Sequence, residues 1–160
     1  MTLESIIPIP EVMQAKKVLC VQPHYDDNDI AAGGTLAALH EAGAELIYLT
    51  VTDDLMGVLD ASLSPEAAAA QLKREQEAAG KVVGVSQHYW LGHPDAGKYD
   101  YFDLRREVIK HIRMVGPDFL FAPAPWLMYE AHRDHVQTCL AAAEAAILYA
   151  LPKIPGSDPE

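Results

Sequence analysis

The chain has 160 residues and a mass of 17.5 kDa, a length that suits one domain with its own core. Half of the residues are hydrophobic and 22% are charged, which is typical of a globular protein and excludes a disordered or collagen-like chain. With 12 basic against 23 acidic residues the net charge is −11, and such an anion lacks the basic surface that nucleic acids or anionic membranes attract.

Three further features bear on the compartment and on membrane insertion. Cys20 and Cys139 lie in apolar runs and form neither a CxxC pair nor a disulfide framework, which favours a reducing environment. The first five residues lack the basic and apolar regions of a signal peptide. No apolar stretch reaches the roughly 18 residues that a membrane helix needs. We therefore expect a cytoplasmic protein without a membrane or nucleic-acid partner.

Short apolar runs alternate with helical patterns along the chain. The first run stops at Pro23, as a buried strand does, and Ser64-Pro65 is typical of an N-cap with proline at the first helical position. In chain order the patterns predict a strand over Lys17–Gln22, a helix over Ile30–Ala42, a strand over Glu45–Val51, a helix from Ser64 to about Gly80, a strand over Gln87–Leu91, a helix over Tyr101–Met114, a strand over Asp118–Ala122 and a helix from near Ala131 to about Ala150.

Strands separated by helices form βαβ units, so the fold class is α/β with a mostly parallel sheet. We expect a single domain over residues 1–150 and a loose tail, rich in proline, over residues 151–160. In a doubly wound sheet of order 3-2-1-4, the first and fourth strands are neighbours at the topological switch point, where such sheets bind ligands.

Polar clusters follow both of these strands: residues 23–29 after the first and residues 130–135 after the fourth. If the two strands are neighbours, the clusters face each other across one crevice. A catalytic zinc takes three protein ligands and leaves one position for water. His24, Asp27 and one or both of His132 and His135 offer suitable ligands, and these residue types alone do not choose between the last two.

Asp26 stands beside Asp27 and is a spare carboxylate that could accept a proton from water. The alternative interpretation is structural, because aspartates commonly cap helices and a helix follows this turn.

The clusters also resemble the two motifs of a known family. Pro23-His24-Tyr25-Asp26-Asp27, followed by Gly33-Gly34-Thr35, resembles the first motif of the LmbE-like (PIG-L) N-acetylglucosaminyl deacetylases, and His132-Arg133-Asp134-His135 resembles their second motif, H-x-D-H. The stretch Phe121–Trp126 is most similar to the archaeal-type diacetylchitobiose deacetylase branch. The resemblance covers about residues 17–150. Many members continue well past the second motif, so the chain resembles the first part of a longer family domain.

This resemblance implies a Rossmann-like, three-layer fold with the metal site at the carboxyl ends of the first and fourth strands. It implies one Zn²⁺ ion per chain, held by His24, Asp27 and His135. Tyr25 departs from the family, in which proline is usual, and brings a phenol into the site region.

The resemblance also implies catalytic roles. Asp26 would be the general base, and His132, oriented by Asp134, would stabilise the oxyanion or protonate the leaving amine. Substrate contacts are expected from polar residues near strand ends and on the second helix, namely Asp53, Arg74 and Asp95, and Asp54 beside Asp53 could line the rim with it. For each of these residues, a solvated surface position is the alternative interpretation.

The implied activity is removal of the acetyl group from an N-acetylated amino sugar, such as N-acetylglucosamine or a chitobiose-type saccharide, with release of acetate. One alternative is a catalytically impaired sugar-binding or assembly module of the same fold. Another is a non-haem iron oxygenase with two histidines and one carboxylate, although we expect such enzymes on β-rich barrels. The apolar loop Ala124–Tyr129 and an open sheet edge predict a homo-oligomer.

Overall fold

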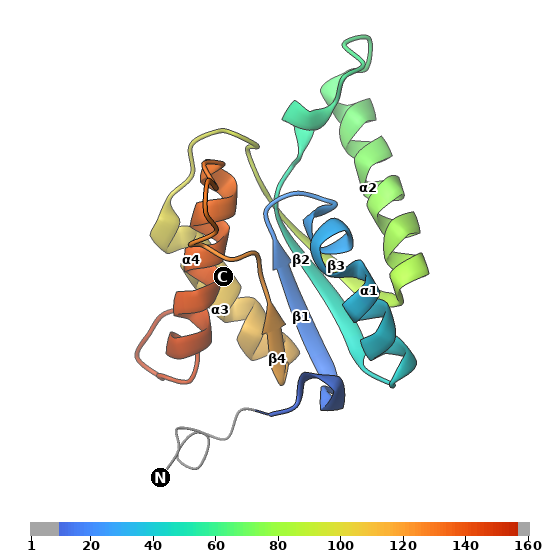
Figure 1. Cartoon of the computed structure of the whole chain (residues 1–160). Coiled ribbons are helices and arrows are strands. Elements are labelled where there is room, and N and C mark those ends of the chain that lie inside the picture. The colour runs from blue at the N-terminus through green and yellow to red at the C-terminus, as the bar shows by residue number, and fades with distance from the viewer. Residues whose placement is uncertain (1–9, 157–160) are drawn as a thin grey trace.

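The computed structural model describes residues 10–156, so residues 1–9 and 157–160, including the start of the chain and the end of the predicted tail, lie outside it. The elements are η2 (Val12–Gln14), β1 (Lys17–Gln22), α1 (Asp27–Glu41), β2 (Glu45–Thr52), η3 (Leu55–Gly57), α2 (Pro65–Val83), β3 (Val85–His93), α3 (Tyr101–Val115), β4 (Phe119–Phe121) and α4 (Arg133–Leu148). The four strands form one parallel sheet in the order β3-β2-β1-β4 (Figure 1), which confirms the predicted α/β fold and strand order.

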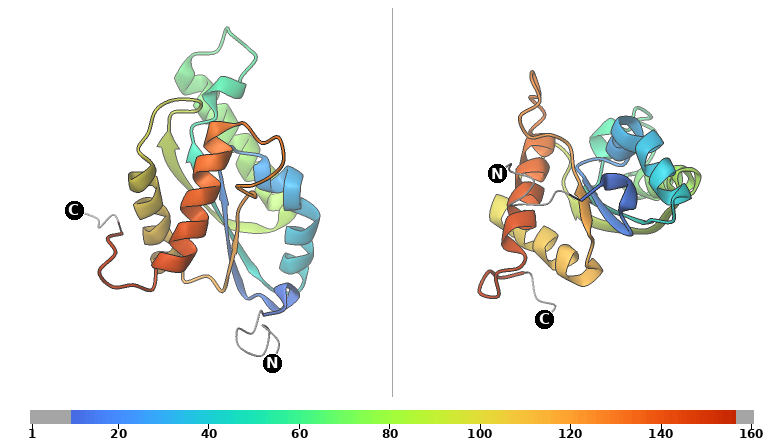
Figure 2. Two further views of the ribbon diagram at one scale, coloured as in Figure 1. Left: turned by 60° about the vertical axis from the view of Figure 1, so that its left-hand side comes forward. Right: turned by 60° about the horizontal axis from the view of Figure 1, so that its bottom comes forward.

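The sheet is the middle of three layers, with α1 and α2 over one face and α3 and α4 over the other (Figures 1 and 2). Successive residues of a strand point to opposite faces, so β1 and β2 supply both cores. The core toward α3 and α4 takes Leu19, Val21, Ile47, Leu49 and Val51 from the strands. The core toward α1 takes Val18, Cys20, Leu46 and Tyr48. Burial on both faces explains why these strands read as continuous apolar runs.

Helix α2 begins as predicted and ends later than predicted. The Ser64 hydroxyl accepts a hydrogen bond from the Ala67 N–H at 3.2 Å, so Ser64 is the N-cap. The helix continues through Gly80 because that glycine faces β3: a Cβ there would lie 2.7 Å from Nε2 of His88. The helix ends at Gly84, whose φ of +100° is the left-handed conformation that glycine adopts without strain.

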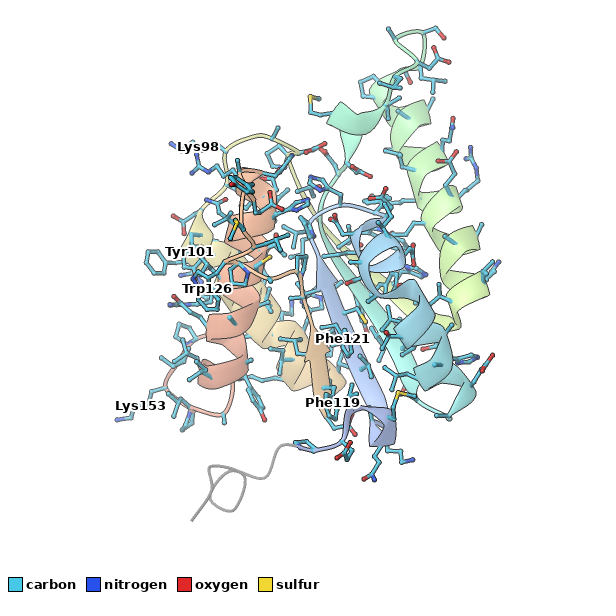
Figure 3. All side chains as sticks on the ribbon, viewed as in Figure 1. Lys98, Tyr101, Phe119, Phe121, Trp126 and Lys153 are labelled. Carbon is cyan, nitrogen blue, oxygen red and sulfur yellow. The ribbon has the colours of Figure 1, made fainter. Side chains whose placement is uncertain are left out.

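Strand β4 is shorter than predicted and pairs only with β1 among the described residues. Phe119 and Phe121 pack partly against the core beside α1 (Figure 3). The tail that was expected to be loose is held as far as Ile154, because the Arg113 guanidinium donates hydrogen bonds to three carbonyl groups, those of Tyr149, Leu151 and Ile154. None of the helices in residues 10–156 combines the length and hydrophobicity of a membrane span.

Candidate metal centre

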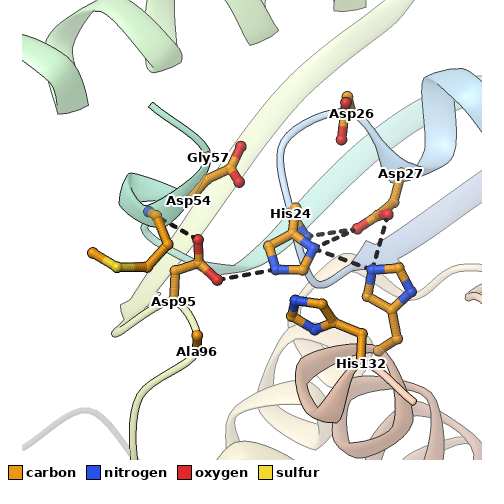
Figure 4. Close-up of a pocket in the computed structure, with 10 residues that line it drawn as sticks. His24, Asp26, Asp27, Asp54, Gly57, Asp95, Ala96 and His132 are labelled. Carbon is orange, nitrogen blue, oxygen red and sulfur yellow. Dashed lines mark hydrogen bonds and ion pairs between the residues drawn. The ribbon is translucent and has the colours of Figure 1, made fainter. Parts of the chain in front are cut away.

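A cavity of about 400 Å³ opens at the carboxyl ends of the strands (Figure 4). Its walls come from the loops after β1, β2 and β3 and from the start of α4. Seven of its lining residues carry an imidazole or a carboxylate: His24, Asp26, Asp27, Asp54, Asp95, His132 and His135. The two sequence clusters therefore meet in one cavity, because β1 and β4 are neighbours in the sheet.

Three of these side chains form a compact triangle of donor atoms. Nδ1 of His24 lies 3.2 Å from Nε2 of His135 and 3.4 Å from Oδ2 of Asp27, and Nε2 of His135 lies 3.3 Å from Oδ1 of Asp27 (Figure 4). Ligands about 2.0–2.1 Å from a tetrahedral zinc are separated by about 3.3–3.4 Å. The chemistry of this donor set suits a zinc ion, and each histidine lies at such a spacing from one of the two Asp27 oxygens.

His132 offers an alternative third donor. Its ring lies edge-on to that of His24, with centroids 4.7 Å apart, and His24, His132 and His135 have ligand atoms within 4.8 Å of one another. The side chain is 44% exposed and stands at the N-cap of α4, one turn before His135. The two histidines thus have two candidate third donors in this structure, Asp27 at 3.3–3.4 Å and His132.

The second ring nitrogen of His24 faces away from the triangle. Nε2 lies 3.2 Å from Oδ1 of Asp95 and 3.7 Å from Oδ2 of Asp134. Asp95 is itself fixed, since its other oxygen accepts a hydrogen bond from the Met56 N–H at 3.0 Å. A carboxylate on the far nitrogen of a ligand histidine orients the ring and raises its basicity.

The electrostatics favour a cation here. Burial lowers the pKa of His24, but the hydrogen bond to Asp27 and the charges of Asp27, Asp95 and Asp54 outweigh it and raise the pKa to about 9. Burial raises the pKa of the Asp54 carboxyl to about 6, although the Tyr25 N–H and His24 oppose that shift. The crowded carboxylates thus favour a positive charge at this point, either as a proton on His24 or as a cation that would take its place.

Asp26 lines the cavity without a structural partner. It occupies the N-cap position of α1, yet its side chain makes no cap hydrogen bond, and the residue is exposed. Asp27 instead uses Oδ2 to accept a hydrogen bond from the His24 N–H at 2.7 Å. Capping therefore does not account for Asp26. Tyr25 is buried and is not among the cavity-lining residues, so its phenol does not enter the site.

Asp134 is placed differently from its predicted role. It is fully buried, and its carboxylate accepts hydrogen bonds from the Ala96 N–H and the Tyr99 hydroxyl, both at 2.8 Å. Nδ1 of His132 lies 4.0 Å from Oδ2 of Asp134, beyond hydrogen-bond distance. In this structure Asp134 fixes the loop after β3 against α4, and it accepts no hydrogen bond from the His132 ring.

The three residues predicted to contact substrate also differ in placement. Asp95 lines the cavity, although its side chain is only 5% exposed and lies against His24. Asp53 does not line the cavity; its Oδ1 accepts hydrogen bonds from the N–H groups of Leu55 and Asp95. Arg74 is exposed on α2 and is not among the lining residues.

The sequence identified two further acidic residues of the site to different extents: Asp54 was expected only at the rim beside Asp53, and Glu130 was assigned no role. Asp54 lines the cavity in place of its neighbour Asp53. Glu130 accepts a hydrogen bond from Nδ1 of His135 at 2.9 Å and another from the His132 N–H at 2.7 Å. The hydrogen bond from the His132 N–H, and to a smaller extent the one from His135, holds the pKa of the Glu130 carboxyl below its ordinary value. Its position just before the H-x-D-H motif was the signal that could have identified it.

Three residues around the site have strained backbones. Asp54, Ala96 and Tyr129 are the non-glycine residues with positive φ in the described part of the chain, at 57°, 53° and 66°. The first two line the cavity, and Tyr129 directly precedes Glu130. L-residues avoid this region at a cost of roughly 1–2 kcal/mol, so strain is concentrated where chain segments approach the site.

Comparisons with known proteins relate this chain to a family of deacetylases. The sequence model of the family described as GlcNAc-PI de-N-acetylase (PIG-L) matches residues 19–146. The diacetylchitobiose deacetylase of Thermococcus kodakarensis is 34% identical over 143 residues, which are 89% of this chain and 54% of that protein. A 1D-myo-inositol 2-acetamido-2-deoxy-α-D-glucopyranoside deacetylase of Kineococcus radiotolerans is 37% identical over 90 residues, covering 54% of this chain and 25% of that one.

Solved structures of related proteins have a similar fold. The N,N′-diacetylchitobiose deacetylase of Pyrococcus horikoshii, complexed with its inhibitor MPG, superposes with a TM-score of 0.84 at 42% identity, over 88% of this chain and 53% of that one. The conserved protein TT1542 of Thermus thermophilus superposes with a TM-score of 0.73 at 30% identity, over 86% and 58%. Most of this chain matches the two diacetylchitobiose deacetylases. It spans about half of their length.

Proposed function

This chain belongs to the GlcNAc-PI de-N-acetylase (PIG-L) family, and we propose that it is a zinc-dependent hydrolase that removes the acetyl group from an N-acetylated amino sugar and releases acetate. The observation that carries the proposal is the donor triangle of His24, Asp27 and His135 beside an unpaired Asp26. Relatives named for deacetylation of acetylated amino sugars support the substrate class.

In this proposal His24, Asp27 and His135 hold one zinc ion. When bound in such a site, zinc lowers the pKa of water toward about 7 and polarises a carbonyl group. Asp26 accepts a proton as the water oxygen bonds to the acetamide carbon. His132, exposed at the cavity, donates a hydrogen bond to the carbonyl oxygen as negative charge develops there. The C–N bond then breaks, and the proton held by Asp26 passes to the leaving nitrogen, which gives a free amine and acetate.

Residues at the mouth of the cavity are proposed to contact the sugar. Asp54 and Asp95 offer carboxylate oxygens that accept hydrogen bonds from hydroxyl groups, and Met56 adds an apolar surface, being 69% exposed. The predicted contacts from Asp53 and Arg74 require movement of the loop or of the α2 side chain, because neither residue lines the cavity here.

The decisive experiment measures acetate release from a panel of N-acetylated sugars, with and without a chelator. We expect release from at least one amino sugar, loss with chelator and recovery with zinc. Retained zinc and sugar binding without acetate release would instead support the alternative of a sugar-binding or assembly module.

We further propose a cytoplasmic homo-oligomer. Cys20 and Cys139 are free and buried, as in a reducing compartment. The loop between β4 and α4 exposes consecutive apolar side chains from Trp126, 81% exposed, to Tyr129, 95% exposed (Figure 3). A second copy on this loop would cover the apolar surface and add a wall to the cavity. Light scattering at micromolar concentration tests the assembly, and a fully active monomer would exclude it.

A further inference from the structure

We propose that Glu130 is a positioning residue that fixes the tautomer and the ring orientation of His135, so that Nε2 of this histidine is presented to a metal ion. The inference rests on the zinc site proposed above. It concerns a residue that lies outside the donor triangle and does not line the cavity.

The geometry of the His135 ring carries the first step. Its Nδ1 lies 2.9 Å from Oε2 of Glu130, and its Nε2 lies 3.2 Å from Nδ1 of His24 and 3.3 Å from Oδ1 of Asp27. A carboxylate only accepts hydrogen bonds, so the contact places a proton on Nδ1. A neutral imidazole with its proton on Nδ1 has its lone pair on Nε2, which is the atom at the triangle.

The Glu130 carboxylate is itself held in place by a second hydrogen bond. Its second oxygen, Oε1, accepts a hydrogen bond from the backbone N–H of His132 at 2.7 Å. The carboxylate thus bridges the ring of His135 and the start of the helix that carries it, and it cannot rotate away without losing a bond. The Glu130 side chain is 17% exposed, which limits competition from water.

The local backbone explains how Glu130 reaches this position. Its N–H donates to the Leu127 carbonyl at 3.0 Å, which closes a turn, and Tyr129 within that turn has a φ of 66°. The chain therefore accepts strain one residue before Glu130. His24, the other histidine of the triangle, has a similar contact: its Nε2 lies 3.2 Å from Oδ1 of Asp95. Each histidine has a carboxylate on the nitrogen that points away from the triangle.

The test compares zinc affinity, measured by competition with a chromophoric chelator, for the unaltered chain, Glu130→Ala, Glu130→Gln and a control, Glu41→Gln. Glu41 is exposed at the end of α1. We expect Glu130→Ala to weaken zinc binding about 10–100-fold, as removal of such partners typically does. Glu130→Gln keeps one acceptor oxygen, so its zinc affinity should lie between those of Glu130→Ala and the unaltered chain. Glu41→Gln should bind zinc as tightly as the unaltered chain.

Two readouts separate positioning from a general loss of structure. The visible absorption of the cobalt(II)-loaded protein should change in Glu130→Ala, because the His135 ring is freed, whereas the control keeps the parent spectrum. Melting of the metal-free proteins shows whether both variants fold. Unchanged zinc affinity in folded Glu130→Ala would overturn this inference alone. Failure of the unaltered chain to bind zinc would overturn the proposed function and this inference with it.

Discussion

His24 and His135 stand 111 positions apart in the chain, yet Nδ1 of His24 lies 3.2 Å from Nε2 of His135. The strand order produces this contact, because β1 and β4 are adjacent and each is followed by one of the two histidines. The donor triangle is completed by Asp27, the first residue of α1. A metal ion held there would join the first and last βα connections of the described chain.

Removal of one corner of the triangle should abolish metal binding. In Asp27→Ala the site keeps two imidazoles and loses the carboxylate that lies 3.3–3.4 Å from both. We expect most of the bound zinc and all of the deacetylase activity to be lost, and the same for His135→Ala. Metal analysis after dialysis measures the effect. An Asp27→Ala protein that binds zinc as tightly as the unaltered chain would show that the ligand set is wrong.

Asp26→Asn should separate chemistry from metal binding. The substitution preserves size and removes the proton acceptor, and Asp26 makes no cap hydrogen bond that would be lost. We expect full zinc content and a fall in kcat of about 10²–10⁴-fold, the usual contribution of a general base. Measured zinc content and kcat on the same preparation decide the matter: a parallel loss of metal would make Asp26 a ligand.

His132→Ala should also keep zinc and lower kcat. The His132 ring lies beside the triangle and is 44% exposed toward the cavity, where it can stabilise negative charge. The backbone N–H that Glu130 holds is unaffected by this substitution. Zinc titration provides the control, since His132 belongs to an alternative donor set with His24 and His135. Strongly weakened zinc binding would favour that set.

Stability should fall as the pH decreases below about 6.5, in part because of His111. Burial lowers the pKa of His111, which is 9% exposed and has Nδ1 2.7 Å from the Glu107 carbonyl oxygen. The unfolded chain therefore takes up a proton at a higher pH than the folded chain does, and protonation favours unfolding. Urea unfolding of metal-free protein at pH 7.5 and about pH 5.5 should show a smaller loss of unfolding free energy for His111→Phe. An identical loss would exclude His111 as the cause.

Much of the fold could be predicted because its local signals agree. Continuous apolar runs marked β1, β2 and β4, and Ser64-Pro65 marked the start of α2. The end of α2 was placed too early, because Gly80 is a stop signal in the sequence and a close-packing position against His88 in the fold. Tertiary contact decided between the two meanings of that glycine.

The sequence predicted that the candidate ligands meet in one cavity, but it did not reveal the contacts that support them. His24, Asp26 and Asp27 follow a strand and therefore had to face the crevice. The choice of His135 over His132 came from the family resemblance, since helical spacing places both near the same face. The contact between Glu130 and His135 depends on the turn closed at Leu127, and the partners of Asp134 depend on the loop after β3. Neither loop conformation follows from residue periodicity.

The positive φ angles of Asp54, Ala96 and Tyr129 affect how this protein tolerates substitution. Replacing Ala96, with its φ of 53°, by glycine relieves roughly 1 kcal/mol of backbone strain. The same change gives the unfolded chain a comparable amount of freedom, about 0.4–1 kcal/mol. Ala96→Gly should therefore be almost silent in a melting curve while it loosens the segment that meets Asp134 and lowers kcat. A screen for thermal stability would therefore not detect substitutions at such positions. A kinetic assay would show what the backbone conformation contributes to kcat.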